Sequence, residues 1–214
     1  MIDPSQYFEA FLDEDQPKDR ITRLLQKNLS EGEEPLGIIK AGLIPALDMI
    51  GDRFSKGTLY IPELIFAGKL MKECLEWLKT EFKFGSEQNL GTLVLGTVKG
   101  DMHDIGKNLV GMIAEASGFS VVDIGVDATS DAFLSAMKTY QPRCVGLSAL
   151  LTTTMLEMKK TVSLINQSEF RKRTKIIVGG APVTETFAER IGADAFGKDA
   201  VNGVIRIKEL SGVK

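Results

Sequence analysis

The sequence predicts two domains, a four-helix bundle followed by an α/β domain with a doubly wound parallel sheet. Up to residue 84, apolar residues repeat at helical spacing. Beyond residue 91, short apolar runs bounded by glycine alternate with helical segments. The stretch between the two patterns, KFGSEQNLG, has the composition of a linker. We therefore divide the chain into a helical bundle at 1–84, a linker at 85–91 and the α/β domain at 92–214.

Three stretches of the first domain carry the helical pattern. The first, PKDRITRLLQKNLSEG, has a stop signal in Gly32, and the last is ELIFAGKLMKECLEWLKTEF. Between them lies PLGIIKAGLIPALDMIGDRFSKG, in which Pro45 predicts a kink or a helix break. Helices of this length need one another to bury their apolar stripes, so we expect four packed helices.

Five strands, each followed by a helix, are expected in the second domain. The strands are predicted at 91–98, 119–125, 143–149, 174–180 and 193–197, and the helices at 104–118, 131–140, 154–167, 183–191 and 199–210. Right-handed crossovers between parallel strands give a flavodoxin-like or Rossmann-like domain. We assume the strand order 2-1-3-4-5 from the number of strands. A ligand would then bind beyond the carboxyl ends of the first and third strands.

The composition excludes several classes of protein. A hydrophobic fraction of 43% is ordinary for a globular protein. The net charge of -3 gives no sign of the excess of basic residues that nucleic-acid-binding proteins carry. The acidic start, MIDPSQYFEAFLDEDQ, lacks the apolar region of a signal peptide, and no apolar run is long enough for a membrane helix. Cys74 and Cys144 form neither a disulfide framework nor a metal pattern. We expect a cytoplasmic protein without nucleic-acid or membrane partners.

The only histidine of the chain lies in the loop KGDMHDIG, after the first predicted strand. No serine or cysteine is placed by this motif to make His103 a general base, and a protein-only zinc site would need more ligands than Asp101 and Asp104 supply. The pattern suits a single axial ligand to a metal that brings its own equatorial ligands, with Asp101 accepting the other ring N–H. Gly100 and Gly106 would let a bulky ligand approach the backbone. A hydrogen-bonded surface histidine is the alternative interpretation.

Several motifs carry a family resemblance. GDMHDIG resembles the Asp-x-His-x-x-Gly motif of cobalamin-binding domains of the methionine synthase type, and GLSAL and VGGAP resemble the Ser-x-Leu and Gly-Gly motifs of that family. IGDRFSKGTLYIPELIFAGKLMKECLEWL is similar to the helical cap that precedes the domain. The resemblance covers residues 15–210. A chain of only these two modules resembles the corrinoid proteins of three-component methyltransferase systems, which act on methanol, methylamines, glycine betaine or aromatic methyl ethers.

The resemblance implies a role for each matching residue. His103 would be the lower axial ligand of cobalt, Asp101 its hydrogen-bond partner, and Thr154 the hydroxyl that completes the relay, where methionine synthase has serine. Lys40 stands where the family has an acidic residue near the corrin. The implied cofactor-binding residues are Gly100, Asp101, Met102, His103, Asp104, Ile105 and Gly106 in the motif loop, Ser148, Leu150, Thr152 and Thr154 facing it, Gly179, Gly180 and Ala181 along the nucleotide tail, and Phe54, Ile61 and Leu64 in the cap.

The implied cofactor is cobalamin or a related corrinoid, alternating between methylcob(III)amide and cob(I)amide. The implied activity is that of a methyl carrier, which is not a complete enzyme alone. Its partners would be a substrate:corrinoid methyltransferase, a second methyltransferase that passes the methyl group to tetrahydrofolate or a thiol, and a reductive activase. The cap would move aside for these enzymes about the linker.

Three other functions fit the same predicted fold. A phosphoacceptor receiver domain would need an aspartate at the end of the third strand, where this chain has Ser148. A cobalamin-dependent regulator or sensor joins a helical bundle to this domain but carries an additional DNA-binding module. The small subunit of an adenosylcobalamin-dependent mutase shares the loop motifs and normally lacks the cap. The last two remain open, and the sequence does not identify the methyl donor or acceptor.

Overall fold

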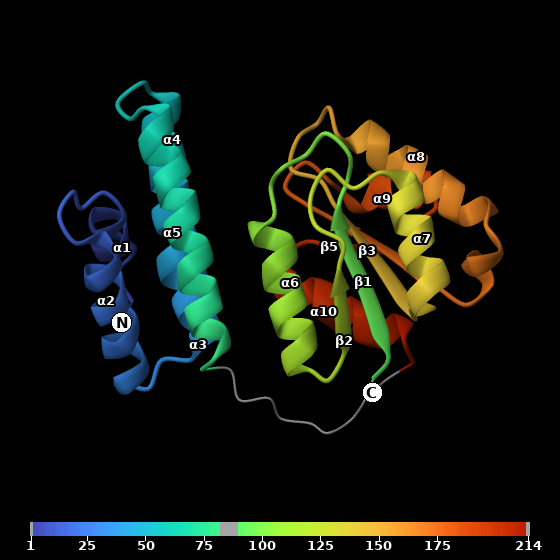
Figure 1. Ribbon diagram of the computed structural model, residues 1–214, viewed down its shortest axis with the longest axis horizontal. Helices are drawn as coiled ribbons and strands as arrows, with labels where there is room; N and C mark the ends of the chain where they lie inside the picture. Colours follow the sequence, from blue (N-terminus) through green and yellow to red (C-terminus); the bar gives the residue numbers. More distant parts are fainter. Residues whose placement is uncertain (1, 82–89, 213–214) are drawn as a thin grey trace. The chain divides into compact units, whose positions relative to one another are not determined.

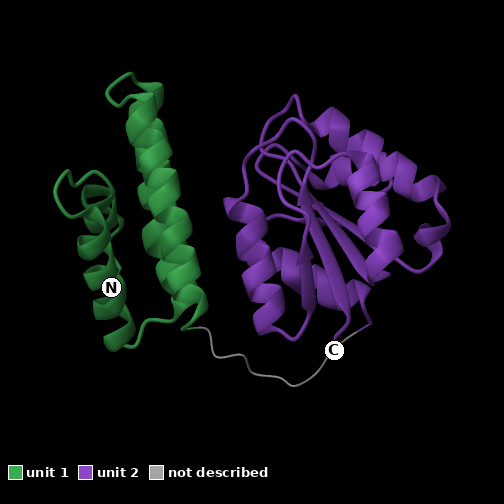
Figure 2. Ribbon diagram, in the orientation of Figure 1, with its two compact units in different colours: residues 1–83 green, residues 84–214 purple. Residues whose placement is uncertain are grey.

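The structure of the chain is a computed structural model that describes residues 2–81 and 90–212. The chain divides into two compact units, Met1–Lys83 and Phe84–Lys214, shown in green and purple in Figure 2. Among the described residues, no helix is both long enough and apolar enough to cross a membrane.

Most of the predicted linker, residues 85–89, lies outside the described residues. Its last two residues are held by hydrogen bonds within unit 2. The Leu90 N–H donates to the Gly118 carbonyl at 2.9 Å, and the Ser120 N–H donates to the Gly91 carbonyl at 3.0 Å.

Unit 1 is a bundle of four helical rods in its described part (Figure 1). Its elements are α1 (Pro4–Phe11), α2 (Pro17–Ser30), α3 (Pro35–Ile38), the π-helical turn η1 (Ile39–Leu43), α4 (Ile44–Ser55) and α5 (Ile61–Lys79). Elements α3, η1 and α4 follow one another without interruption and form one rod. Helix α1 packs on α2 and α4, and α5 packs on α2 and α4. The side chains of Phe11, Ile50 and Met71 are buried between the rods, as expected for helices that share one core.

A kink or a helix break was predicted at Pro45, and the break does not occur, because a π turn directly precedes the proline. Ile38, Ile39 and Ile44 all keep right-handed helical dihedrals, and the Ile44 N–H donates to the Ile39 carbonyl, five residues back. Pro45 then falls in the first turn of α4. A proline lacks the N–H of a regular helix and clashes with the carbonyl four residues earlier. The wider π turn accommodates both defects, so the rod continues through the proline.

Unit 2 has the predicted alternation of strands and helices. The strands are β1 (Thr92–Thr97), β2 (Ser120–Asp123), β3 (Cys144–Ser148), β4 (Lys175–Gly179) and β5 (Ala195–Gly197). The helices are α6 (Ile105–Ala116), α7 (Ser130–Tyr140), α8 (Met155–Gln167), the 3-10 turn η2 (Glu169–Lys172), α9 (Glu185–Ile191) and α10 (Ala200–Leu210). All strand pairs are parallel, and their order is β2-β1-β3-β4-β5. The assumed strand order and the predicted fold class are therefore confirmed.

Helices cover both faces of the sheet (Figure 1). Alternate residues along a strand serve opposite faces. Val94 packs in one core with α7, α8 and α9, whereas Leu93 and Leu95 pack in the other with α6 and α10. Strands that are buried on both faces must be apolar throughout, which explains the short unbroken apolar runs of the sequence.

The carboxyl ends of four strands line up in one row. Thr97 of β1 pairs with Ser148 of β3, Ser148 with Gly179 of β4, and Gly179 with Gly197 of β5. The loops that follow these strands therefore start side by side along one edge of the sheet. This edge carries the predicted site.

Candidate functional site

The carboxylate of Asp101 joins two loops of this edge. Asp101 lies in the loop between β1 and α6 and is fully buried. Its Oδ1 accepts hydrogen bonds from the backbone N–H of His103 at 3.1 Å and from His103 Nδ1 at 2.8 Å. Its Oδ2 accepts bonds from the loop between β3 and α8, donated by Leu150 N–H at 2.7 Å, Leu151 N–H at 3.2 Å and Thr154 Oγ1 at 2.7 Å. One carboxylate thus accepts five hydrogen bonds, two from His103 in its own loop and three from the loop between β3 and α8.

These hydrogen bonds determine the charge of Asp101. Burial raises the pKa of a carboxyl group, but the bonds from Thr154, Leu150 and His103 stabilise the carboxylate and outweigh burial, so the pKa of Asp101 lies well below its usual range. An ionised carboxylate only accepts hydrogen bonds. The proton of a neutral His103 ring is therefore held on Nδ1, which leaves the lone pair of Nε2 for a ligand.

The ring of His103 is accessible from outside, since its side chain is 52% exposed. An imidazole whose Nδ1–H is held by a buried carboxylate and whose ring reaches the surface is arranged as metal-ligating histidines are in proteins. The donor set is one nitrogen, which fits a metal that already carries its equatorial ligands.

The backbone of the motif loop is fixed by residues that the sequence did not single out. The buried hydroxyl of Thr97 donates to the His103 carbonyl at 2.9 Å. Asp127, in the loop between β2 and α7, accepts the Gly100 N–H at 2.7 Å and donates its own N–H to the Asp101 carbonyl at 3.0 Å. These three bonds join residues of different elements, so no local sequence pattern signals them.

The other predicted residues of the motif loop occupy two environments. Asp104 is the N-cap residue of α6, and Ile105 and Gly106 form the first turn of that helix. Met102, in contrast, which precedes His103 in the chain, is 67% exposed.

In the facing loop, Leu150 and Thr152 are exposed. Leu150 contributes its backbone N–H to Asp101 and not its side chain. Ser148 ends β3, and its carbonyl accepts the Val98 N–H at 3.0 Å.

The two glycines at the end of β4 lie close to neighbouring backbone, and at Gly180 only glycine fits. Gly180 has φ +129, and a Cβ there would lie 1.8 Å from the Ala149 carbonyl oxygen. A Cβ on Gly179 would lie 3.1 Å from the Gly197 carbonyl oxygen. The space that Gly180 leaves is thus filled by the loop between β3 and α8, which approaches closely here. Ala181 follows them and is exposed.

The predicted residues of unit 1 lie where α4 ends and α5 begins. Phe54 and Leu64 are half-buried, and Ile61, the first residue of α5, is 61% exposed. Tyr60, Ile65 and Phe66 next to Ile61 are exposed as well. Exposed apolar side chains at the start of one helix make this region a candidate contact surface.

Two family models match the chain. A B12 binding domain matches residues 91–205, and a second B12 binding domain matches residues 14–79. Together they span both units, and the first alone covers more than half of the chain.

Named relatives agree with these matches. Dimethylamine corrinoid protein 2 of Methanosarcina acetivorans is 38% identical over 90% of this chain and 89% of its own length. Trimethylamine corrinoid protein 2 of Methanosarcina mazei is 35% identical over 86% of this chain and 85% of its own.

Solved structures show the same fold. The monomethylamine corrinoid protein of Methanosarcina barkeri is 30% identical, with a TM-score of 0.84 over 95% of this chain and 96% of that one. A cobalamin-binding protein of Desulfitobacterium hafniense DCB-2 is 33% identical, with a TM-score of 0.55 over 98% of this chain and 99% of that one.

The family resemblance and the corrinoid cofactor that the sequence implied are confirmed by these matches. The accessible imidazole of His103, held by a buried carboxylate, fits a cofactor whose metal takes one ligand from the protein. The chain belongs to the B12-binding family and is a corrinoid protein related to the methylamine corrinoid proteins.

Proposed function

We propose that the chain is the methyl carrier of a methyltransferase system. It would accept a methyl group from a substrate-specific methyltransferase and present it to a second methyltransferase that acts on tetrahydrofolate or a thiol. The observation that carries this proposal is the relay His103–Asp101–Thr154, which holds one imidazole ready as a metal ligand. Because the relatives are named for mono-, di- and trimethylamine, a methylated amine is the first methyl donor to test.

A bound corrinoid would supply a cobalt centre that can take up and give up a methyl group. In our proposal His103 Nε2 would bind this cobalt, while Asp101 keeps the proton of the ring on Nδ1. Thr154 supports Asp101 from the other side through its hydroxyl.

The state of Asp101 also supports this role of the histidine. Asp101 is held ionised by its hydrogen bonds, so a negative charge would lie 2.8 Å from His103 Nδ1 whether or not Nε2 held a metal.

The remaining predicted residues would bind the rest of the cofactor. The motif loop Gly100–Gly106 would lie against the corrin. Ser148, Leu150, Thr152, Gly179, Gly180 and Ala181 would border the nucleotide tail at the carboxyl edge of the sheet. Phe54, Ile61 and Leu64 of unit 1 would cover the upper face of the corrin and limit the access of water and oxygen. A reductive activase would be the third partner, since a nucleophilic cobalt centre is lost by oxidation.

The decisive experiment loads the purified chain with hydroxocobalamin and compares the visible spectra of the wild type and His103→Ala. We expect about one corrinoid per chain and a histidine-ligated spectrum that the variant lacks. A second arm adds adenosylcobalamin, the cofactor of mutases, in competition. A wild type that keeps no corrinoid, or keeps it with the same spectrum as His103→Ala, contradicts the proposal, and a strong preference for adenosylcobalamin favours a mutase subunit.

A further inference from the structure

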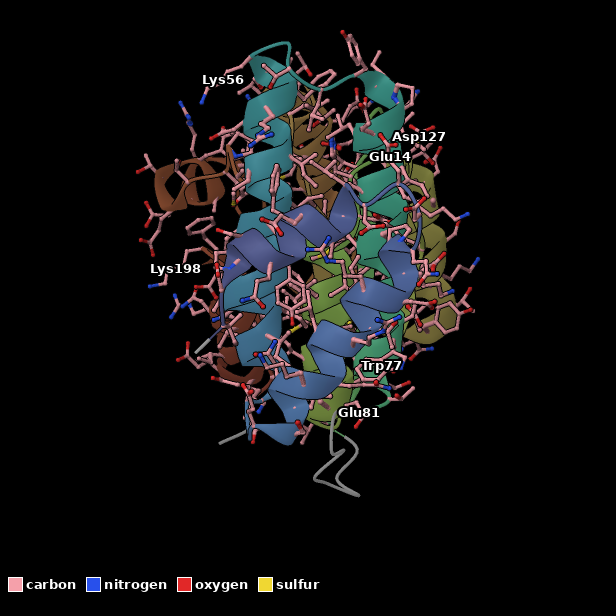
Figure 3. All side chains as sticks on the ribbon, turned by 90° about the vertical axis from the view of Figure 1, so that its left-hand side faces the viewer. Glu14, Lys56, Trp77, Glu81, Asp127 and Lys198 are labelled. Atoms are coloured by element: carbon pink, nitrogen blue, oxygen red, sulfur yellow. The ribbon has the colours of Figure 1, made fainter. Side chains whose placement is uncertain are left out.

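Asp127 has an unusual backbone conformation for a residue with a side chain. It lies in the loop between β2 and α7, is exposed, and is labelled in Figure 3. Its φ is +53, in the left-handed region that glycine prefers. Aspartate tolerates this region better than most residues, but it is still a local cost that the rest of the fold must offset.

The left-handed conformation lets both polar groups of Asp127 reach the motif loop. Its Oδ1 accepts the Gly100 N–H at 2.7 Å, and its backbone N–H donates to the Asp101 carbonyl at 3.0 Å. The two bonds hold the peptide unit before Gly100 and the peptide unit after Asp101, so they enclose these two residues. Gly100 itself has φ +82. The bond to Oδ1 has a charged acceptor and belongs to the stronger class of hydrogen bonds.

The segment held by these two bonds contains Asp101, whose carboxylate orients His103. On its far side, Asp101 is held by the loop between β3 and α8 through Oδ2. The loop of Asp127 holds the same residue through its backbone. Asp101 therefore lies between two loops that both contact it, and its Oδ1 lies 2.8 Å from His103 Nδ1.

We propose that Asp127 is a positioning residue for the metal-ligating histidine. By fixing the backbone of Gly100 and Asp101, it keeps Oδ1 of Asp101 on His103 Nδ1 and so leaves Nε2 for a ligand. The part of this inference that concerns a metal depends on the proposed function. The part that concerns the imidazole does not.

Two substitutions at Asp127 separate the effect of its carboxylate from the effect of its backbone strain. Asp127→Gly accepts φ +53 without strain and removes the acceptor, whereas Asp127→Asn tolerates the left-handed region and keeps an acceptor oxygen. Gln141 is the matched control, because it is the other described non-glycine residue with positive φ, at 46, and it caps α7. Gln141→Gly relieves the same kind of strain away from the motif loop.

The test uses the full-length, ¹⁵N-labelled chain without a histidine tag and without corrinoid. Because the chain contains one histidine, the imidazole ¹⁵N signals at pH 8 report the tautomer of His103 alone. We expect the Nδ1–H form to dominate in the wild type and its ratio to the Nε2–H form to fall about fivefold in Asp127→Gly. Asp127→Asn should stay within about twofold of the wild type, and Gln141→Gly should not change the ratio.

If Asp127→Gly has the same tautomer ratio as the wild type, the proposal is overturned. This holds even if the variant unfolds at a lower temperature, because a purely structural role of Asp127 would affect stability alone. The same proteins are then loaded with hydroxocobalamin. A lower histidine-ligated fraction in Asp127→Gly than in Gln141→Gly extends the positioning role to the metal. If the tautomer shifts but the wild type never shows a histidine-ligated spectrum, the proposed function fails and the positioning of the imidazole stands.

Discussion

The hydroxyl of Thr154 lies 2.7 Å from Oδ2 of Asp101 and is buried with it. The hydroxyl oxygen of Thr154 also lies 2.8 Å from the Leu151 carbonyl oxygen. A hydroxyl has one proton, so it can donate fully to only one of these acceptors at a time. Donation to the charged carboxylate is the stronger bond, and it connects Thr154 to His103 through Asp101.

Replacement of Thr154 by valine should weaken the relay without changing its shape. The variant keeps the branched side chain but leaves Oδ2 with one donor fewer, and we expect a loss of about 1–3 kcal/mol in the free energy of unfolding. The histidine-ligated fraction of the corrinoid-loaded protein should fall as well. Urea unfolding and visible spectra measure the two effects. Thr154→Ser keeps the hydroxyl and should remain close to the wild type. Equal results for valine and serine would show that the hydroxyl is dispensable.

The contribution of Asp101 to stability should depend on pH in one direction. Its pKa is lowered in the folded chain, so the folded state binds its proton less readily than the unfolded state, where the pKa is about 3.9. The stabilisation is therefore complete above that value and is lost as the pH falls through the lower, folded pKa.

Comparison with Asp101→Asn isolates this contribution. The difference in unfolding free energy between the wild type and the variant should shrink as the pH falls below about pH 4. Urea unfolding curves at several pH values measure it. A difference that grows as the pH falls below about pH 4 would falsify the assignment of Asp101 as an ionised acceptor.

Gly180 and Gly106 should respond to alanine in opposite ways. Gly180→Ala places a Cβ in the space of the Ala149 carbonyl, so we expect more than about 3 kcal/mol of destabilisation or displacement of the loop. Gly106 lies in the first turn of α6, and a Cβ there meets no atom within 4 Å. Gly106→Ala should therefore be neutral or stabilising by up to about 1 kcal/mol. Thermal unfolding of the corrinoid-free chain distinguishes the two.

Corrinoid retention adds a second readout for this pair. If Gly106 allows the cofactor to approach the backbone, Gly106→Ala should fold normally and retain less corrinoid after gel filtration. Normal retention by Gly106→Ala would remove this glycine from the proposed binding residues.

The buried ammonium of Lys107 should be sensitive to the loss of its acidic partner. Its Nζ donates to Asn108 Oδ1 at 2.8 Å and to the Asp123 carboxylate, which ends β2. Asp123 is partly exposed, so we expect Asp123→Asn to cost about 1–3 kcal/mol, less than for a fully buried pair. Lys107→Met removes the charge and keeps the length of the side chain.

A double-mutant cycle measures the coupling within this ion pair. Asp123→Asn should be less damaging in the Lys107→Met background, because no buried charge is then left unpaired. Strictly additive effects of the two substitutions would contradict this account of the pair.

The sequence predicted the architecture of unit 2 well because its signals are local. Short apolar strands that are buried on both faces alternate with helices, and the number of strands led to the strand order that the sheet has. The Asp-x-His-x-x-Gly motif likewise places Asp101 and His103 two residues apart, so their contact is short-range.

Local sequence patterns did not predict the contacts between different elements. Thr97 and Asp127 fix the motif loop through bonds to residues 6 and 27 positions away. No periodicity signals such pairs before the topology is known. Helix α1 was not singled out either, although Asp3 caps it with a 2.9 Å bond to the Ser5 N–H and Pro4 opens it. That start signal stands in an acidic segment, which we interpreted only as evidence against a signal peptide.

The 49-residue separation between Asp101 and Leu150 has a kinetic consequence. A nascent chain that has emerged only as far as α7 contains His103, but it lacks β3 and the donors that complete the environment of Asp101. The imidazole becomes oriented only when β3 docks beside β1, a non-local step that closes a long loop. The chain should therefore bind a corrinoid only after the sheet is complete. Partly synthesised or truncated chains should bind none and remain colourless.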